Sequence, residues 1–598
     1  MCGIVGYIGK RDAQPIILGA LKRLEYRGYD SCGIAVLSNG KIEVFKERGT
    51  IDELEKALGG TRISGTVGIG HTRWATHGEP SRRNAHPHTD CKGDIVVVHN
   101  GIIENFQRLR EKLTEEGHVF RSDTDTEVVA HLVEKYYNGN LEEAVKRALR
   151  EIKGSYALAI LHKADEKIIA ARNKSPLVLG VGDGEFFVAS DIPALLEHTN
   201  RVIYLEDGDL IVITKGGFRI ENGGAVVSRK TETVLWSIED AEKGGYEHFM
   251  LKEIHETPRV IEDTLATHLR DSALGTMNLD LDVPRPAEVL MVACGTSFHA
   301  ALVGKYVIEE LAGVPVRVNL ASEFNYAATP LSRGTLVVGI TQSGETADTL
   351  SALRKARAAG CATLAITNVL GSSVTRLADR VIYMRAGPEI CVAATKTFTA
   401  QLITLYLLAL HFSDMELAEK QKMFKELRRL PMAVQRVLDV EDKIKRISER
   451  IASYENVFFI GRGISFPVAL EGALKLKEIS YIHAEGYAAG ELKHGPFALL
   501  TEKTPVVAIV ARDRTYDTML GNIKEVKARN APVVAVADEN DDEIEKYVDF
   551  VIRTPHVEAI FSAVTNSVAL QLLAYYAARK RGCEIDKPRN LAKSVTVE

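Results

Sequence analysis

The sequence has no excess of either charge and no long apolar run. It holds 75 Lys and Arg residues against 80 Asp and Glu residues, a formal net charge of −5. Without a basic excess or a basic run, the chain lacks the electrostatic pattern of a nucleic-acid-binding protein. The longest apolar stretch, 402–410, is far shorter than the roughly 20 residues that a membrane-spanning helix needs. We therefore expect neither nucleic acid nor a membrane as a partner.

Cysteine is scarce, and no leader segment is visible. Seven cysteines scattered over 598 residues predict reduced thiols and no disulfide framework. The first residues, MCGIVGY, contain no charged segment followed by an apolar one and no small-residue cleavage site, so the sequence predicts no secretion signal. We expect a cytoplasmic protein.

The length and the pattern of apolar segments predict several domains. At roughly 150 residues per domain, 598 residues correspond to about four units. Up to about residue 215, short β-type segments cluster and amphipathic helices interrupt them, which is typical of α+β layers with antiparallel sheets. From about residue 289, strand and helix alternate strictly, which predicts parallel, doubly wound sheets.

The second half of the chain repeats itself. The tripeptide DTL at 348–350 recurs as DTM at 517–519, an offset of 169 residues, so we expect two tandem α/β units. A charged helical stretch over 417–454, interrupted at Pro431, connects them. The predicted limits are 1–236 for the α+β domain, 237–282 for a linker, 283–425 and 454–588 for the two α/β domains, 426–453 for the connecting helices and 589–598 for a C-terminal tail.

Cys2 is the candidate nucleophile. If Met1 is removed, Cys2 carries both a thiol and a free α-amine, whose reference pKa of about 7.7–8.0 suits a general base near neutral pH. Nucleophile and base then belong to one residue, as they do where an N-terminal amine activates a threonine. Position alone leaves open that Cys2 is only a small apolar residue at the start of a strand.

Four separated motifs follow Cys2 in order. They are LEYRGYDS at 24–31, HTRWATHG at 71–78, HNGIIEN at 99–105 and DTDTE at 123–127. Together they resemble the glutamine amidotransferase domains of the N-terminal-nucleophile (Ntn) class over residues 2–230. The resemblance implies an Ntn fold in which Cys2 attacks the side-chain amide of glutamine to give a thioester and free ammonia. The other roles that it implies are Asn100 and the Gly101 N–H as oxyanion hole, Arg73 on the glutamine carboxylate, Asp125 on its ammonium group, and Thr76 and His77 in the pocket.

Histidines are concentrated in the same region and suggest a metal site. The set comprises His71, His77, His86, His88 and His99, with Asp90 and Cys91 near by in sequence. Imidazole is the commonest zinc ligand, but the spacing fits no closed four-ligand pattern. We expect these histidines to be pocket and turn residues, and we predict no metal.

Two hydroxyl-rich turns follow neighbouring predicted strands in the second half. They are GTS at 295–297 and TQSGET at 341–346. Such turns are usually helix caps, but two on adjacent strands favour a neutral phosphate cradle. Neither has the glycine pattern of a dinucleotide loop or the GK[ST] of an ATP loop. The second copy has VARDRT at 510–515 in place of 341–346, so we expect only the first copy to bind a ligand.

Further motifs extend the comparison to the whole chain. They are ALEGALKLKE at 469–478, ELKHGP at 491–496 and PRNLAKSVTVE at 588–598. With the turns and the duplication, they resemble the tandem sugar-isomerase (SIS) domains of the glutamine:fructose-6-phosphate aminotransferase (isomerizing) family, also called glucosamine-6-phosphate synthases. The resemblance implies conversion of fructose 6-phosphate and glutamine to glucosamine 6-phosphate and glutamate, the first step of amino-sugar biosynthesis.

The resemblance also implies roles for residues of the second half. Lys593 would form a Schiff base with the open-chain ketose, Glu478 would move a proton from C1 to C2, and His494 would assist ring opening from a partner subunit. Lys475 and Lys477 are candidates for support. Sugar and phosphate would be bound by Thr296, Ser297, Thr341, Gln342, Ser343, Thr346 and the backbone of Val392.

The remaining expectations concern ammonia, cofactors and oligomeric state. Trp74 would gate the released ammonia, and no cofactor is needed because a lysine activates the ketone. We expect a homodimer with sites shared between subunits. Two positions depart from the family pattern: Thr341 stands where serine is usual and keeps a hydroxyl, whereas Ala394 stands where serine is usual and loses one.

Two other functions are compatible with parts of the sequence. A phosphoribosylamine-forming or asparagine-forming amidotransferase would need a phosphoribosyltransferase loop or an SGGxDS-type loop, and the sequence contains neither. The other alternative is a sugar-phosphate sensor with tandem isomerase-like domains and a glutaminase domain. The presence of Lys593, Glu478 and His494 favours the enzyme.

Overall fold

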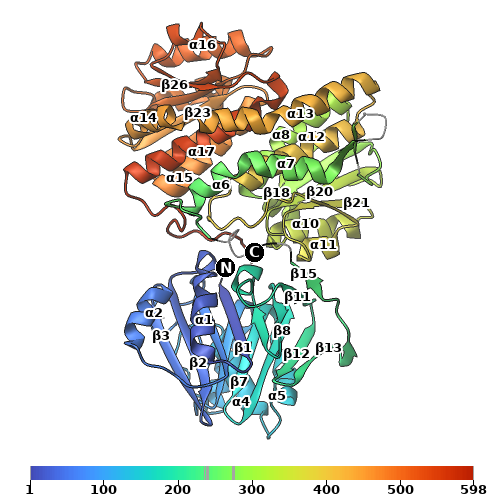
Figure 1. Cartoon of the computed structure of the whole chain (residues 1–598), viewed down its shortest axis with the longest axis vertical. Helices are drawn as coiled ribbons and strands as arrows, with labels where there is room; N and C mark the ends of the chain where they lie inside the picture. The colour runs from blue at the N-terminus through green and yellow to red at the C-terminus, as the bar shows by residue number, and fades with distance from the viewer. Residues whose placement is uncertain (1, 235, 237–241, 272–276, 280, 597–598) are drawn as a thin grey trace. The chain divides into compact units, whose positions relative to one another are not determined.

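The computed structural model describes residues 2–234, 236, 242–271, 277–279 and 281–596, and the chain divides into two compact units (Figure 1). The first unit comprises Met1–Ala241 with Gly371–Ser373 and Ala592–Glu598. The second comprises Glu242–Leu370 and Val374–Leu591.

The first unit contains two antiparallel sheets. One has eight strands in the order β15-β11-β9-β10-β1-β4-β2-β3, and the other has seven in the order β14-β13-β12-β8-β7-β6-β5. The strands are β1 (Gly3–Ile8), β2 (Ser31–Ser38), β3 (Lys41–Arg48), β4 (Val67–Arg73), β5 (His88–Thr89), β6 (Ile95–Ile103), β7 (Gly154–His162), β8 (Asp165–Asn173), β9 (Val178–Val181), β10 (Phe186–Ala189), β11 (Arg201–Tyr204), β12 (Asp209–Thr214), β13 (Gly217–Asn222), β14 (Ala225–Val227) and β15 (Glu232–Thr233).

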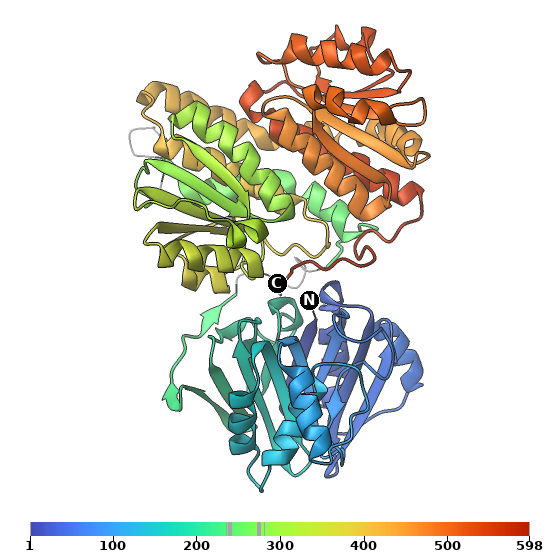
Figure 2. The ribbon, with the colours of Figure 1, turned by 180° about the vertical axis from the view of Figure 1, so that it is seen from behind.

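Helices cover the outer faces of these sheets. They are α1 (Ala13–Lys22), α2 (Ile51–Leu58), α3 (Phe106–Glu115), α4 (Glu127–Tyr136) and α5 (Leu141–Glu151), with short 3-10 turns η1 (Glu25–Arg27) and η2 (Ile192–Ala194). Helix α1 packs on β1 and β4, whereas α3–α5 pack on the seven-stranded sheet (Figure 2). The layers are therefore helix, sheet, sheet, helix, and the predicted α+β Ntn fold is confirmed.

Strand β6 shows why this fold gives apolar runs and not simple alternation. Val96 and Val98 belong to the core between the two sheets, whereas Ile95 and Val97 belong to the core under α3–α5. Successive side chains point to opposite faces of a strand, and both faces are buried here. The run at 95–98 is therefore apolar throughout.

The second unit contains two five-stranded parallel sheets with the same strand order, β19-β18-β20-β21-β22 and β24-β23-β25-β26-β27. The predicted tandem doubly wound domains are confirmed. The strands are β18 (Glu288–Ala293), β19 (Val316–Leu320), β20 (Thr335–Thr341), β21 (Ala362–Thr367), β22 (Arg380–Tyr383), β23 (Asn456–Gly461), β24 (His483–Ala488), β25 (Val506–Val510), β26 (Val533–Asp538) and β27 (Phe550–Thr554), and a separate hairpin pairs β16 (Leu269–Asp271) with β17 (Met277–Leu279).

Helices lie on both faces of each parallel sheet. They are α6 (Phe249–His255), α7 (Thr257–His268), α8 (Gly295–Ala312), α9 (Ala321–Tyr326), α10 (Ala347–Ala358), α11 (Ser373–Leu377), α12 (Lys396–Phe412), α13 (Leu417–Leu438), α14 (Glu441–Ile451), α15 (Ser465–Ser480), α16 (Tyr516–Lys527) and α17 (Ser562–Lys580), with 3-10 turns η4 (Ala489–His494), η5 (Pro496–Leu499), η6 (Ile544–Lys546) and η7 (Ala559–Phe561). One continuous core joins α8 and α12 of the first SIS-type domain to α15 and α17 of the second.

Two segments between the predicted domains differ from expectation. The predicted linker 237–282 contains α6 and α7, whose side chains Met250, Ile254 and Ile261 belong to the core of the second unit. Residues 237–241, 272–276 and 280 of that linker lie outside the described residues. The interruption expected at Pro431 is wrong, because α13 continues through it. Pro431 is buried with the apolar face of α13, and this packing outweighs the roughly 3 kcal/mol that an interior proline costs.

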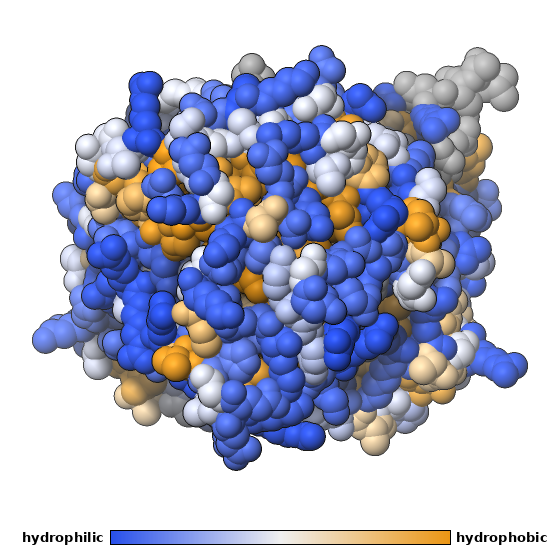
Figure 3. Space-filling view, turned by 90° about the horizontal axis from the view of Figure 1, so that it is seen from below, coloured by the Kyte–Doolittle hydropathy of each residue, from blue (hydrophilic) through white to orange (hydrophobic). Residues whose placement is uncertain are grey.

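One segment of the described chain, Ala559–Lys580, is long and apolar enough to cross a membrane. Of its most apolar window, 83% is buried inside the protein, as in the core helix of a soluble domain. Polar residues cover most of the face in Figure 3, and apolar ones gather there in separate patches.

Candidate functional site

Cys2 lies directly before β1, and its sulfur contacts the backbone of Trp74. The Trp74 N–H donates to Cys2 Sγ at 3.3 Å, and the Trp74 carbonyl oxygen lies 3.5 Å from the same sulfur. The antiparallel register sets Gly3 opposite Thr72, which places residue 2 beside the end of β4. Burial raises the pKa of the Cys2 thiol above its ordinary value, so the thiol needs a base before it can attack.

Asn100 presents an amide donor beside Cys2. Its Nδ2 donates to the Cys2 carbonyl oxygen at 2.8 Å, and its Oδ1 lies 3.0 Å from His71 Nε2. Burial lowers the pKa of His71 to about 3, so the ring is neutral near pH 7. Since Nε2 also lies 3.0 Å from the His99 carbonyl oxygen, it carries the proton and fixes the orientation of the Asn100 amide.

Gly101 follows Asn100 on β6, and no other residue fits there. Its φ is +124°, and a Cβ would lie 2.1 Å from the Ser155 carbonyl oxygen of the neighbouring strand β7. Conformation and space therefore both require glycine. The predicted oxyanion pair Asn100–Gly101 thus sits on a fixed stretch of β6, close to Cys2 through Asn100.

Arg73 and Asp125 provide opposite charges at the same place. Their exposed fractions are 3% and 4%. The Arg73 guanidinium donates to the Gly78 carbonyl oxygen at 2.9 Å, and Asp125 Oδ2 accepts from the Ile103 N–H at 2.8 Å. Burial lowers the pKa of Arg73, while the charges of Cys2 and Asp125 act in the opposite direction, so the three groups lie within electrostatic range. Such a pair can hold the carboxylate and ammonium groups of an amino acid.

Thr76 and His77 lie on the loop that follows β4. Thr76 is exposed, and His77 is half-buried with its ring edge-on to Phe106 at 5.2 Å. Asp30 braces this loop, because its Oδ2 accepts from the Ala75 N–H at 2.8 Å. No role for Asp30 was predicted from the sequence, although it lies in the motif at 24–31.

Gly28 of the same motif was missed as well. A Cβ at this position would lie 2.6 Å from both the Arg73 carbonyl carbon and the Trp74 nitrogen. The motif at 24–31 therefore lets the chain pack directly against the backbone that holds Cys2. The sign of this close packing in the sequence is a glycine that stands between charged and aromatic residues.

Three of the histidines considered as metal ligands, His86, His88 and His99, lie against hydroxyl groups. His86 Nε2 and His99 Nδ1 both lie 2.9 Å from Thr126 Oγ1, and His88 Nε2 lies 3.0 Å from Thr124 Oγ1. Burial lowers the pKa of all three histidines, so their rings are neutral. They support the two threonines that flank Asp125.

In the second unit, the turns at 295–297 and 341–346 lie at the carboxyl ends of neighbouring strands. Strand β18 leads into α8 and β20 leads into α10, and these two helices lie on opposite faces of the sheet. The strand order reverses between β18 and β20, which is where doubly wound folds bind ligands. The two turns therefore lie at the expected ligand crevice.

The loop 341–346 is held by its own hydroxyl groups. Thr341 Oγ1 accepts from the Gly344 N–H at 3.2 Å and lies 3.0 Å from Thr346 Oγ1. Thr341 is buried, so its hydroxyl shapes the loop, while Gln342, Ser343 and Thr346 are partly exposed. The Thr341 hydroxyl therefore makes the hydrogen bonds that hold the loop.

A buried charged group lies between the two SIS-type domains. Lys475 on α15 donates to Thr296 Oγ1 on α8 at 3.0 Å and to Glu478 at 2.5 Å, and Thr296 donates to Glu471 at 3.2 Å. Burial alone would lower the pKa of Lys475, but Glu478 and Glu471 raise it above its ordinary value. Lys475 is therefore an ammonium that orients Glu478. Lys477, two residues further along α15, is exposed.

Ser297 and Val392 are fixed by neighbours within the second unit. Ser297 Oγ accepts from Gln401 Nε2 at 2.9 Å, and the Val392 N–H donates to the Asp586 carbonyl oxygen at 3.1 Å. Glu389, for which no role was predicted from the sequence, accepts from the Thr395 N–H at 2.9 Å. These bonds shape the loop before α12, which contains the half-buried Ala394.

The two remaining candidate catalytic residues are Lys593, in the C-terminal tail, and His494. Asp586 fastens the start of the tail by accepting from the Phe249 and Met250 N–H groups at 2.9 and 3.0 Å. Lys593 is half-buried and belongs to the stretch Ala592–Glu598 that clusters with the first unit. His494 is exposed at the end of η4.

Family comparisons define the class of protein. A model of the glutamine amidotransferase domain matches residues 71–197, and a model of the SIS domain matches residues 285–411 and 450–581. The fold agrees with both matches. The chain is a glutamine amidotransferase joined to two SIS domains.

Full-length relatives identify the family. The chain is 54% identical over 621 residues to a glutamine--fructose-6-phosphate aminotransferase [isomerizing] of Methanosarcina acetivorans and 51% identical over 608 residues to that of Caldanaerobacter subterraneus, each alignment covering 100% of both chains. A solved C-terminal domain of glucosamine-fructose-6-phosphate aminotransferase from Francisella tularensis is 38% identical, with a TM-score of 0.55 over 58% of this chain and 99% of that one. The chain belongs to the glutamine--fructose-6-phosphate aminotransferase [isomerizing] family.

Proposed function

We propose that this protein converts D-fructose 6-phosphate and L-glutamine to D-glucosamine 6-phosphate and L-glutamate, the first step of amino-sugar biosynthesis. The supporting observation is that one chain contains two polar sites, one suited to each half of the reaction. Cys2, Asn100 and Arg73 form an amidohydrolase site, and Thr296, Lys475 and Glu478 form a polar site at the crevice of the SIS domains.

The first half-reaction uses the N-terminal residue as nucleophile and base. After removal of Met1, the Cys2 amine takes the thiol proton and the sulfur attacks the glutamine amide carbon. The Asn100 amide and the Gly101 N–H stabilise the resulting oxyanion, while Arg73 and Asp125 hold the α-carboxylate and the ammonium group. The amine then protonates the leaving ammonia, and water hydrolyses the thioester to glutamate. Thr76 and His77 close the pocket, and Trp74 gates the ammonia.

The second half-reaction joins ammonia to the ketose. His494 of a partner subunit assists opening of the sugar ring, and the Lys593 amine condenses with the C2 carbonyl to a Schiff base with loss of water. Ammonia displaces the lysine, and Glu478 takes a proton from C1 and returns one to C2. The Lys475 ammonium holds the Glu478 carboxylate in place for this transfer.

The phosphate and the sugar hydroxyls fit the crevice between β18 and β20. Gln342, Ser343 and Thr346 are partly exposed at the loop, Ser297 lies at the start of α8, and Thr341 and Val392 shape the surroundings. Helix N-termini at this edge favour the negative charge of phosphate. We further propose a cytoplasmic homodimer, because the exposed His494 is then available to the site of the partner subunit.

One assay tests the proposed function. The purified full-length chain is incubated with glutamine and fructose 6-phosphate, and glucosamine 6-phosphate and glutamate are measured. Equal amounts of both products are expected. Glutamine hydrolysis with bound fructose 6-phosphate but no amino sugar would favour the sensor alternative.

A further inference from the structure

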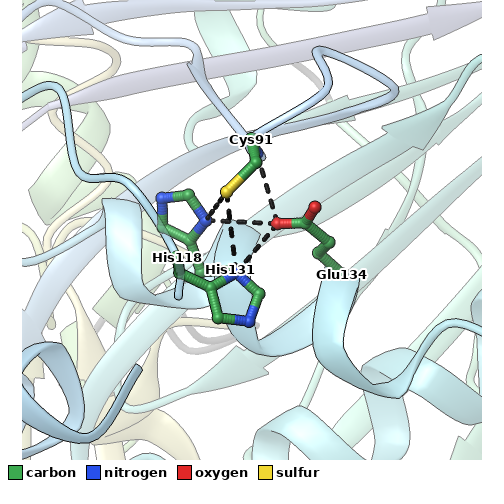
Figure 4. A group of neighbouring side chains, drawn as sticks. All are labelled: Cys91, His118, His131 and Glu134. Atoms are coloured by element: carbon green, nitrogen blue, oxygen red, sulfur yellow. Dashed lines mark hydrogen bonds and ion pairs between the residues drawn. The ribbon is translucent and has the colours of Figure 1, made fainter. Parts of the chain in front are cut away.

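Four side chains of the first unit converge on one point outside the glutamine site (Figure 4). Cys91 comes from the loop between β5 and β6, His118 from the segment after α3, and His131 and Glu134 from α4. The spacing of three residues puts His131 and Glu134 on one face of α4. One ligand atom from each side chain lies within 4.8 Å of all the others.

The separations match a tetrahedral metal site. Cys91 Sγ lies 3.7 Å from His118 Nδ1 and 3.6 Å from His131 Nδ1. Glu134 Oε2 lies 3.0 Å and 3.3 Å from the same two nitrogens. With zinc–sulfur bonds of about 2.3 Å and zinc–nitrogen or zinc–oxygen bonds of about 2.0 Å, tetrahedral angles separate sulfur from nitrogen by about 3.5 Å and nitrogen from oxygen by about 3.3 Å.

The surroundings suit a metal-bound thiolate and imidazole. The Val119 N–H donates to Cys91 Sγ at 3.4 Å. His131 Nε2 faces Glu127 Oε1 at 3.6 Å, and a carboxylate behind a ligating histidine is the usual outer partner of a zinc site. The side chain of His131 is 1% exposed, whereas those of His118 and Glu134 are 13% and 14% exposed, so an ion can enter from the solvent side.

We propose that Cys91, His118, His131 and Glu134 bind one zinc ion. A thiolate with two imidazoles suits zinc and disfavours magnesium and calcium, which prefer oxygen ligands. The protein fills all four positions, which is typical of a structural site and not of a catalytic one. On binding, the Cys91 thiol releases its proton to solvent. No metal was predicted from the sequence, because the spacing of Cys91 and the histidines at 71–99 fits no closed four-ligand pattern; His118 and His131 lie outside that group.

The ion would tie the segment 116–126 to the rest of the first unit. His118 lies near the start of this segment, α4 follows its end, and Asp125 lies within it. The loop before β6 is joined to α4 by the Cys91 N–H, which donates to Glu134 Oε2 at 3.2 Å. If Asp125 binds the ammonium group of glutamine, which rests on the proposed function, loss of zinc raises KM for glutamine more than it lowers kcat.

Metal content tests the proposal without recourse to activity. The full-length protein is incubated with zinc chloride, desalted and measured by inductively coupled plasma mass spectrometry. We expect about one tightly bound zinc per chain, and Cys91→Ser or His118→Ala should weaken zinc binding by more than the roughly 10- to 100-fold cost of changing an outer partner. Cys583→Ser and His483→Ala alter a half-buried cysteine and an exposed histidine of the second unit, and should retain zinc.

A spectroscopic readout keeps the test decisive if a variant folds poorly. Cobalt(II) bound to the wild type should show a near-ultraviolet sulfur-to-cobalt charge-transfer band, which Glu134→Gln weakens and Cys91→Ser abolishes. The proposal is overturned if the wild type retains no more zinc than Cys91→Ser, or if its cobalt complex lacks the band. An inactive aminotransferase that still binds zinc would count against the proposed function alone.

Discussion

The side-chain amide of Asn100 donates a hydrogen bond of 2.8 Å to the carbonyl oxygen of Cys2, a residue 98 positions away in the sequence. The amide cannot turn freely, because the neutral ring of His71 holds its oxygen at 3.0 Å. A donor that is oriented before the substrate arrives costs no reorganisation when charge develops on the substrate. This arrangement makes the Asn100 amide the group best placed to stabilise an oxyanion beside Cys2.

Asn100→Ala should slow glutamine hydrolysis. Loss of one oxyanion donor lowers kcat by about 10²–10³-fold in comparable sites. The measurement is glutamate release under saturating glutamine, with isomerisation of fructose 6-phosphate to glucose 6-phosphate as the control, since that reaction does not use this site. An unchanged kcat would show that Asn100 is not part of the oxyanion hole.

Cys2→Ala should abolish glutaminase activity, by roughly 10³-fold or more, and spare sugar isomerisation. Forced retention of Met1 should act similarly, because it acylates and displaces the amine that serves as base. Mass spectrometry of active protein should find Cys2 at the N-terminus. A fully active species that begins with Met1 would contradict the assignment.

Lys475→Met should both destabilise the protein and stop glucosamine 6-phosphate formation. The side chains of Lys475 and Glu471 are 1% and 2% exposed, and removing one partner of a buried pair costs about 3–5 kcal/mol in the free energy of unfolding. Denaturant unfolding measures this cost. The double variant Glu471→Gln/Lys475→Met should recover part of the stability and none of the synthesis, whereas equal loss in both variants would argue against the pair.

The stability of the first unit should fall in acid because of its neutral histidines. Burial lowers the pKa of His71 from 6.5 to about 3, so between these values the unfolded chain binds more protons than the folded one. The free energy of unfolding therefore rises with pH over this window. The stabilising contribution of neutral His71 is fully present above pH 6.5. His71→Gln should flatten the profile of unfolding free energy against pH between 6.5 and 4. A profile as steep as that of the wild type would contradict this cause.

Lys593→Arg should eliminate glucosamine 6-phosphate formation and sugar isomerisation while basal glutamine hydrolysis continues. A guanidinium stays protonated and cannot form the imine. Borohydride reduction in the presence of fructose 6-phosphate should trap a sugar adduct on Lys593 in the wild type. Peptide mapping that finds the adduct on Lys475 instead would refute both the role of Lys593 and the ammonium state of Lys475.

Much of the fold could be predicted because its signals are local. The alternation of strands and helices after residue 289 and the offset of 169 residues predicted two doubly wound domains, and the two sheets have the same strand order. Pro431 shows the limit of local rules. Its cost to a helix is fixed by the backbone, but whether the helix survives depends on how its apolar face is buried.

Arg73 and Asn100 could be predicted as candidate site residues because they lie in compact motifs. The sequence did not decide which of Lys475 and Lys477 supports the site. Packing decides it, because Lys475 contacts Thr296 of α8 whereas Lys477 is exposed. Glu478 lies three residues from Lys475 on the same helix, so that contact follows from helix geometry. Thr296 lies 179 positions away, and only the tertiary structure brings it to Lys475.

The sequence by itself determined the class of both halves and indicated Cys2 as the candidate nucleophile, because short strings at fixed positions carry that information. Only the tertiary structure brought Cys91 to His118 and His131, which lie 27 and 40 positions along the chain. Metal-site spacing in a sequence detects ligands that are close together in the chain, as in Cys-x-x-Cys pairs. Here the packing of α4 against the sheet brings the ligands together, and that contact depends on the buried apolar face of the helix and not on the spacing of the ligands.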